Sequence, residues 1–76
     1  MANSIRVKAN EMRKLSEIYK LNASGMAERI GVNRETYLRA MEGGNVSASF
    51  VAGATLGFGI EFSSLFYSVR AENVAA

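Results

Sequence analysis

Residues Asn22 to Glu42 read NASGMAERIGVNRETYLRAME, and this stretch predicts two short helices joined by a tight turn. Asn22 and Asn33 belong to the residue types that cap helix N-termini, and Gly31 is suited to end the first helix. Ala27 lies four positions before Gly31, where a small side chain lets two helices cross closely. Together these features are typical of a helix-turn-helix unit.

Apolar residues recur in this stretch at spacings of three and four, so they are predicted to line the inner side of both helices. The predicted inner residues are Met26, Ala27, Ile30, Val32, Tyr37, Ala40 and Met41. The second helix, over residues 34–42, is predicted to expose a different set of side chains, namely Arg34, Glu35, Leu38, Arg39 and Glu42.

More helices are predicted on both sides of this unit, because the chain has no Pro and few β-branched runs. Before it, a helix over residues 10–20, capped by Asn10, is expected to bury Met12, Leu15, Ile18 and Tyr19. Ile5 and Val7 alternate with Arg6 and Lys8, a pattern that fits an N-terminal arm, an edge strand or a first helical turn.

After the unit, Ser49 is predicted to cap an apolar helix that ends near Gly57 to Gly59. Its expected buried residues are Phe50, Val51, Ala54 and Phe58. A last short helix over residues 62–69 is expected to bury Leu65, Phe66 and Val69. The expected fold class is therefore all-α, a compact bundle of four or five helices.

The length of 76 residues allows one small domain. We expect residues 1–9 to form an N-terminal arm, residues 10–70 the helix-turn-helix domain and residues 71–76 a flexible tail. The start of the chain lacks the pattern of a secretory signal, and the uncharged stretch over residues 45–60 is short for a membrane span. A cytoplasmic location without membrane contact is therefore expected.

Composition argues against catalysis, because the chain contains no Cys, His or Asp. The common nucleophile, general-base and metal-ligand sets cannot be assembled without them. We therefore expect no enzyme activity, cofactor, metal ion or small-molecule substrate. Residues 1–39 carry an excess of four positive charges, whereas the rest of the chain is net acidic, so the N-terminal half is expected to face an anion.

The pattern extends beyond the two helices, with Met12, Leu15 and Leu21 before them and Glu42-Gly43-Gly44 after them. Over Met12 to Phe66 the chain resembles the Cro/repressor-type, or lambda-repressor-like, helix-turn-helix family, and its length is more similar to that of small phage Cro proteins than to full repressors. The resemblance implies a compact helical bundle that binds operator DNA as a dimer and reads the major groove with its third helix.

Transferred to this chain, the resemblance makes Asn33, Arg34, Glu35, Leu38 and Arg39 the candidate base-reading residues. An arginine fork matches guanine O6 and N7, a glutamate accepts from cytosine N4, and leucine can contact a thymine methyl. The alternative for Arg34 and Arg39 is a solvated pairing with Glu35 and Glu42 on the helix surface.

Candidate phosphate contacts come from both sides of the unit and comprise Arg6, Lys8, Arg13, Asn22, Ser24 and Asn45. The sequence departs from the family pattern at two places near these residues. Ala23 stands where the family often has Gln, and Asn45-Val46-Ser47 replaces a loop that usually carries Pro.

The expected function is sequence-specific binding of double-stranded DNA by a small transcriptional regulator, a Cro-like repressor. A homodimer is expected at least on DNA, with contacts from Phe62, Phe66, Tyr67 and Val69. The alternative is an interaction protein on the same fold, an antirepressor or antitoxin that binds another protein.

Overall fold

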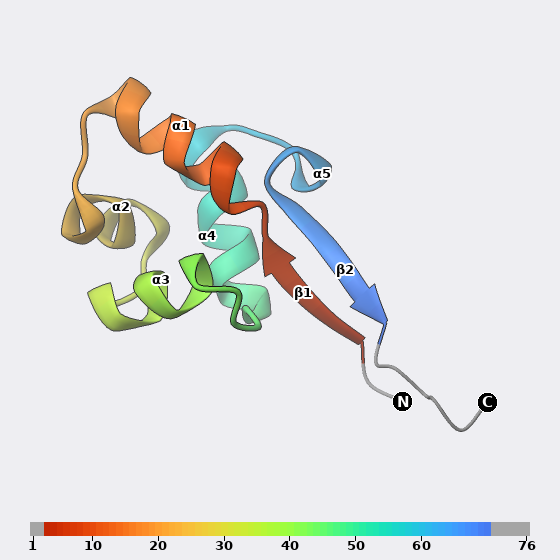
Figure 1. Ribbon diagram of the computed structural model, residues 1–76. Helices are drawn as coiled ribbons and strands as arrows, with labels where there is room; N and C mark the ends of the chain where they lie inside the picture. The colour runs from red at the N-terminus through yellow and green to blue at the C-terminus, as the bar shows by residue number, and fades with distance from the viewer. Residues whose placement is uncertain (1–2, 71–76) are drawn as a thin grey trace.

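The computed structural model describes residues 3–70, and within them it shows five helices and a small two-stranded antiparallel sheet (Figure 1). In chain order the elements are β1 (Asn3–Val7), α1 (Ala9–Tyr19), α2 (Ala23–Ile30), α3 (Arg34–Met41), α4 (Ala48–Phe58), α5 (Phe62–Leu65) and β2 (Phe66–Arg70). The domain is therefore mostly helical, as predicted. The all-α expectation was wrong in omitting the sheet.

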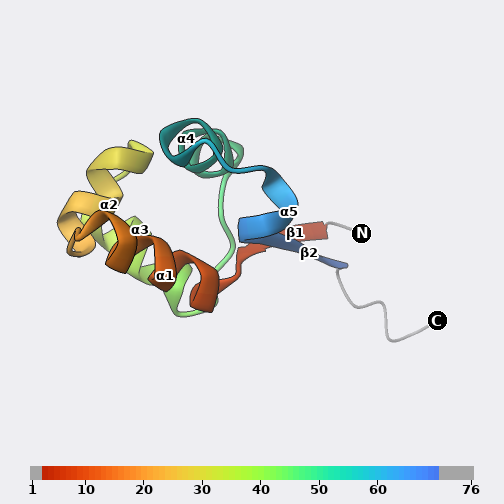
Figure 2. The same cartoon turned by 90° about the horizontal axis from the view of Figure 1, so that it is seen from above.

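The sheet joins the two ends of the described chain. β1 and β2 pair antiparallel, with Val7 opposite Phe66 and Asn3 opposite Arg70. Figures 1 and 2 show them as a ribbon that extends away from the helices. Of the three possibilities for the N-terminal segment, a strand forms rather than an arm or a helical turn. The predicted helix over residues 62–69 was wrong after Leu65, because β1 supplies a pairing partner that no local pattern reveals.

The hydrophobic core lies where the helices meet the base of this ribbon. Its largest fully buried side chains are Met12, Met26, Phe50, Leu65 and Phe66. Burial of each such side chain contributes about 1.5–3 kcal/mol to the stability of the folded state. The predicted inner residues of the central unit are confirmed as buried at Met26, Ala27, Ile30, Tyr37 and Ala40, while Val32 and Met41 are half-buried.

The first helix begins and packs differently from the prediction. α1 starts at Ala9 after Lys8, whereas the Asn10 side chain accepts a hydrogen bond from Arg13 instead of capping the helix. Met12 and Leu15 are buried as predicted, but Ile18 is 70% exposed. At 100° per residue, Ile18 lies about 90° around the helix from the middle of the Met12–Leu15 face, so it cannot reach the core.

The fourth helix begins earlier than predicted and packs closely on α2. Ser47, rather than Ser49, is the N-cap, and its Oγ accepts a hydrogen bond from the Phe50 amide at 3.1 Å. A Cβ atom on Gly53 would overlap the carbonyl oxygen of Ile30 at the end of α2. The glycine therefore allows an approach between the two helices that no other residue permits.

None of the helices described over residues 3–70 combines the length and apolar character needed to cross a bilayer.

Candidate nucleic-acid interface

α2 and α3 are held at a fixed angle by the turn between them. Gly31 has φ +97°, and the amides of Gly31 and Val32 both donate to the Ala27 carbonyl, at 2.8 and 2.9 Å. The left-handed conformation suits glycine because it has no Cβ. Ala27 is buried at the crossing, as its small side chain predicts. The local sequence therefore sets the direction in which α3 leaves the turn.

Both predicted asparagine caps are confirmed. The Asn22 Oδ1 accepts from the Gly25 amide at 2.8 Å, and the Asn33 Oδ1 accepts from the Thr36 amide at 2.7 Å. These bonds begin α2 at Ala23 and α3 at Arg34. α3 ends at Met41, one residue before the predicted end, and Glu42 is its C-cap.

The outer side of α3 carries the predicted base-reading residues. In Figure 1 the helix lies along the lower side of the molecule, with no other element beneath it. Arg34, Glu35 and Arg39 are exposed. Leu38 is half-buried and packs against the core, so it presents less surface than predicted. Asn33 is exposed, but its side-chain oxygen is occupied by the cap.

The charges on α3 do not neutralise one another. Among the side chains that the structure describes, the ion pair within 4.0 Å joins Lys14 to Glu11 at 3.4 Å, on α1. The alternative pairing of Arg34 and Arg39 with Glu35 and Glu42 is therefore not found. Both guanidinium groups keep all their donors available to a ligand.

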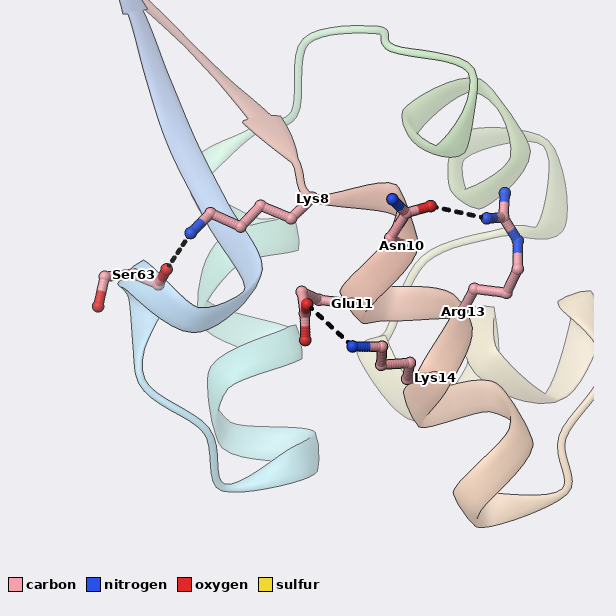
Figure 3. A network of polar contacts seen from close by, with 6 residues as sticks. All are labelled: Lys8, Asn10, Glu11, Arg13, Lys14 and Ser63. Atoms are coloured by element: carbon pink, nitrogen blue, oxygen red, sulfur yellow. Dashed lines mark hydrogen bonds and ion pairs between the residues drawn. The ribbon is translucent and has the colours of Figure 1, made fainter.

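Arg13 and Lys8 point in opposite directions from the start of α1, as Figure 3 shows. The Arg13 Nη1 donates to Asn10 Oδ1 at 3.1 Å, on the side facing α3. Its positive charge also acts on buried Tyr37 of α3. Burial raises the pKa of the Tyr37 hydroxyl above its ordinary 10.0, and Arg13 partly opposes this rise. The Lys8 Nζ instead donates to the Ser63 carbonyl at 2.8 Å, on α5.

Two other candidate phosphate contacts meet beside the end of α3. The Arg6 Nε donates to Asn45 Oδ1 at 3.3 Å, and the Val46 amide donates to the Ile5 carbonyl at 2.9 Å. β1 is thus attached to the loop that follows α3. Ser24 is exposed in the first turn of α2, next to the Asn22 cap. The structure therefore groups Arg6 with Asn45 and Ser24 with Asn22, and places Lys8 apart from both.

Arg29 makes structural contacts with three residues of other segments, and the local sequence does not predict them. Its guanidinium carbon lies 4.4 Å from the centre of the Tyr19 ring and 5.3 Å from that of Phe58, and its Nε donates to the Gly57 carbonyl at 2.8 Å. These contacts tie α2 to the ends of α1 and α4. No local pattern shows them, because Tyr19 and the adjacent Gly57 and Phe58 lie far from Arg29 along the chain and far from each other.

The predicted dimer residues differ in their accessibility. Phe62 and Tyr67 are 36% and 43% exposed, and Val69 is half-buried. Phe66 is only 1% exposed, because its ring stacks on Phe62 and meets Phe50 edge-on. Phe66 is therefore buried within the chain, as the sequence predicts, and presents no surface to a dimer partner. Its alternation with Tyr67 along β2 turns the two rings to opposite faces of the ribbon.

Comparisons with protein-family models, with curated proteins and with solved structures find no match to this chain.

Proposed function

We propose that this protein binds double-stranded DNA sequence-specifically and acts as a small transcriptional regulator, a Cro-like repressor. In this proposal α2 and α3 form the helix-turn-helix of a lambda-repressor-like domain, and α3 enters the major groove. The observation that carries the proposal is the outer side of α3. It presents Arg34 and Arg39 exposed and without ion-pair partners among the described side chains, on a helix fixed by the Ala27–Gly31 turn.

The donors and acceptors on α3 match base edges. Arg34 and Arg39 each offer a fork for guanine O6 and N7, and Glu35 offers an acceptor for cytosine N4. Because Leu38 is half-buried, its contact with a thymine methyl is limited to its exposed part. Glu35 also repels phosphate, which penalises an incorrect register on the duplex.

Groups flanking α3 are suited to hold the sugar–phosphate backbone. The α2 N-terminus carries exposed Ser24 beside Asn22, and backbone amides at a helix N-terminus attract anions. Arg6 and Asn45 lie together past the other end of α3, and Arg13 reaches toward α3 from α1. These contacts position the protein, while base contacts select the sequence.

A second candidate function is protein binding on the same fold, as an antirepressor or antitoxin. The observation in its favour is that exposed Glu35 on α3 and exposed Glu42 at its C-cap lie near the arginines, which weakens attraction to a polyanion. The two functions differ in salt dependence. DNA binding releases counterions and weakens steeply with salt, whereas a largely apolar protein interface does not.

The proposal is tested by selecting bound sites from random duplex DNA. We expect enrichment of one motif, arranged as a palindrome with half-sites about 34 Å apart if the protein binds as a symmetric homodimer. A pool that shows no enrichment after selection would contradict sequence-specific DNA binding. In that case the protein-binding function would become the leading one.

A further inference from the structure

The chain leaves α3 through two consecutive glycines that have different surroundings. Gly43 has φ +99°, and its amide donates to the Ala40 carbonyl at 3.1 Å. The Gly44 amide donates to the Arg39 carbonyl at 3.0 Å. These two bonds form a common helix ending, in which a left-handed residue turns the chain and the next residue bonds back to the last helical turn. The ending therefore brings Gly44 against Arg39.

Gly44 has no side chain at a position where this helix ending often places an apolar one. A Cβ atom on Gly44 would lie 2.9 Å from the carbonyl oxygen of Arg39 and 3.2 Å from its Cγ. Both distances are shorter than ordinary van der Waals contact, so the space is filled by Arg39. Gly44 does not adopt a positive φ, so its φ would admit other residues. The need for glycine comes from the contact with Arg39.

The loop that carries Gly44 is fixed to β1. The Asn45 Oδ1 accepts from the Arg6 Nε at 3.3 Å, and the Val46 amide donates to the Ile5 carbonyl at 2.9 Å. Because these bonds follow Gly44 directly, the stem of Arg39 lies against a part of the backbone that is held in place. The rest of the Arg39 side chain is exposed. Its stem is therefore held at Cγ, while its guanidinium group is available to a ligand.

We propose that Gly44 is a positioning residue, which holds the stem of Arg39 in one direction before DNA binds and thereby strengthens selection of the base that Arg39 reads. This role rests on the proposed function, since it concerns one side chain of that interface. A contact at Cγ fixes the first side-chain torsion, χ1, of Arg39. An exposed arginine otherwise loses its rotamer freedom when it binds, which weakens binding. With χ1 already fixed in the folded protein, less freedom is lost at the correct base.

The variant Gly44→Ala places a Cβ where the Arg39 Cγ lies, so the stem is expected to adopt other rotamers. Affinity for a selected DNA site is expected to fall about 2- to 10-fold, the effect of immobilising one long side chain. Affinity for a site altered at the base pair that Arg39 reads is expected to stay the same, because that contact is absent there. Binding titrations measure the ratio of the two affinities. An equal loss on both sites, as a purely structural role would give, would overturn the proposal.

Two further proteins serve as controls. Gly43→Ala strains the left-handed backbone, but a Cβ there would meet nothing within 4 Å. It is expected to lower the free energy of unfolding and to leave the ratio of affinities unchanged. In an Arg39→Ala background the Cγ is absent, so Gly44→Ala is expected to have no further effect on the ratio. A Gly44→Ala effect on the ratio that persists in this background would contradict a role through Arg39.

A measurement on the unmodified protein without DNA tests the contact itself. Three-bond NMR couplings that report χ1 are expected to show one dominant rotamer for Arg39 and averaging for Arg34, which is exposed at the start of α3. Averaged couplings for Arg39 would overturn the proposal. This measurement is independent of DNA, so it separates two failures. A protein that selects no DNA motif but holds Arg39 in one rotamer would contradict the proposed function and would leave the contact with Gly44 established.

Discussion

Tyr37 is a buried residue of α3 whose hydroxyl is also influenced by the charge of Arg13. Its side chain belongs to the hydrophobic core and is only 4% exposed. Burial disfavours the phenolate, whereas the positive charge of Arg13 favours it, and burial dominates. The side chain therefore packs in the core as a neutral group.

This burial predicts a loss of stability at alkaline pH. The folded pKa of Tyr37 lies above the unfolded value of 10.0. Its contribution to the free energy of unfolding is therefore complete below pH 10.0 and is lost as pH rises through the folded pKa. The Tyr37→Phe variant is expected to lack this part of the decline while having similar stability at neutral pH. Chemical denaturation of both proteins across this range measures the difference. Parallel curves would show that Tyr37 does not titrate in the way proposed.

Arg39 lies on the exposed side of the helix proposed to enter the major groove. Arg39→Ala is expected to weaken binding to a selected site by about 1–3 kcal/mol and to relax the preference at one base position in each half-site. Binding titrations on a set of single-base variants of that site test this. Lys14→Ala is the control, since it removes one positive charge from α1. An equal loss on every sequence would make Arg39 a phosphate contact.

At the scale of elements, α4 depends on two glycines that face the end of α2. Gly53 lies against the Ile30 carbonyl, and a Cβ on Gly57 would approach the Arg29 carbonyl to 2.7 Å. The spacing of four residues puts both on one side of the helix. Because α2 supports α3, this contact also sets how the proposed reading helix is held.

The close contact predicts whether replacing Gly53 raises or lowers the free energy of unfolding. Helix propensity alone would make Gly53→Ala stabilising by about 0.5–1 kcal/mol. The overlap with Ile30 should instead make it destabilising by about 1–3 kcal/mol, because the helices must move apart. Denaturant unfolding measures the change, and Ala52→Gly at the adjacent exposed position reports the propensity effect alone. A more stable Gly53→Ala protein would rule out the tight crossing.

At the scale of the whole molecule, the formal net charge is only +2, so its distribution matters more than its total. The described contacts separate the cationic side chains that are held by partners away from α3 from those that lie beside α3. Arg29 lies over the Tyr19 and Phe58 rings, Lys8 is bonded to α5 and Lys14 is paired with Glu11. Arg6 and Arg13 remain on the side of α3, where a duplex would pass.

This division predicts which cations contribute to salt-dependent binding. Each phosphate contact adds about 0.9 to the slope of log affinity against log salt concentration. Arg13→Gln is expected to reduce the slope by about that amount for all DNA sequences. Lys14→Gln, one position away but directed at Glu11, is expected to leave it unchanged. Titrations at several salt concentrations measure both, and equal slopes for the two variants would remove Arg13 from the interface.

Local sequence determined the central unit of this protein. The caps at Asn22 and Asn33, the turn at Gly31 and the buried side of α2 and α3 all follow from residues within a few positions of one another. Capping bonds and left-handed turns are closed over such short spans, so a single sequence predicts them. The exposed Arg34, Glu35 and Arg39 follow from the same periodicity.

Tertiary structure decided the features that depend on partners far along the chain. β2 forms because β1 lies beside it, so the second half of the helix predicted over residues 62–69 is a strand instead. The stacking of Arg29, the approach of Gly53 to α2 and the bond from Arg6 to Asn45 likewise join distant segments. Periodicity reports which face of one element is apolar, but the partner that covers that face is set only when the whole chain packs.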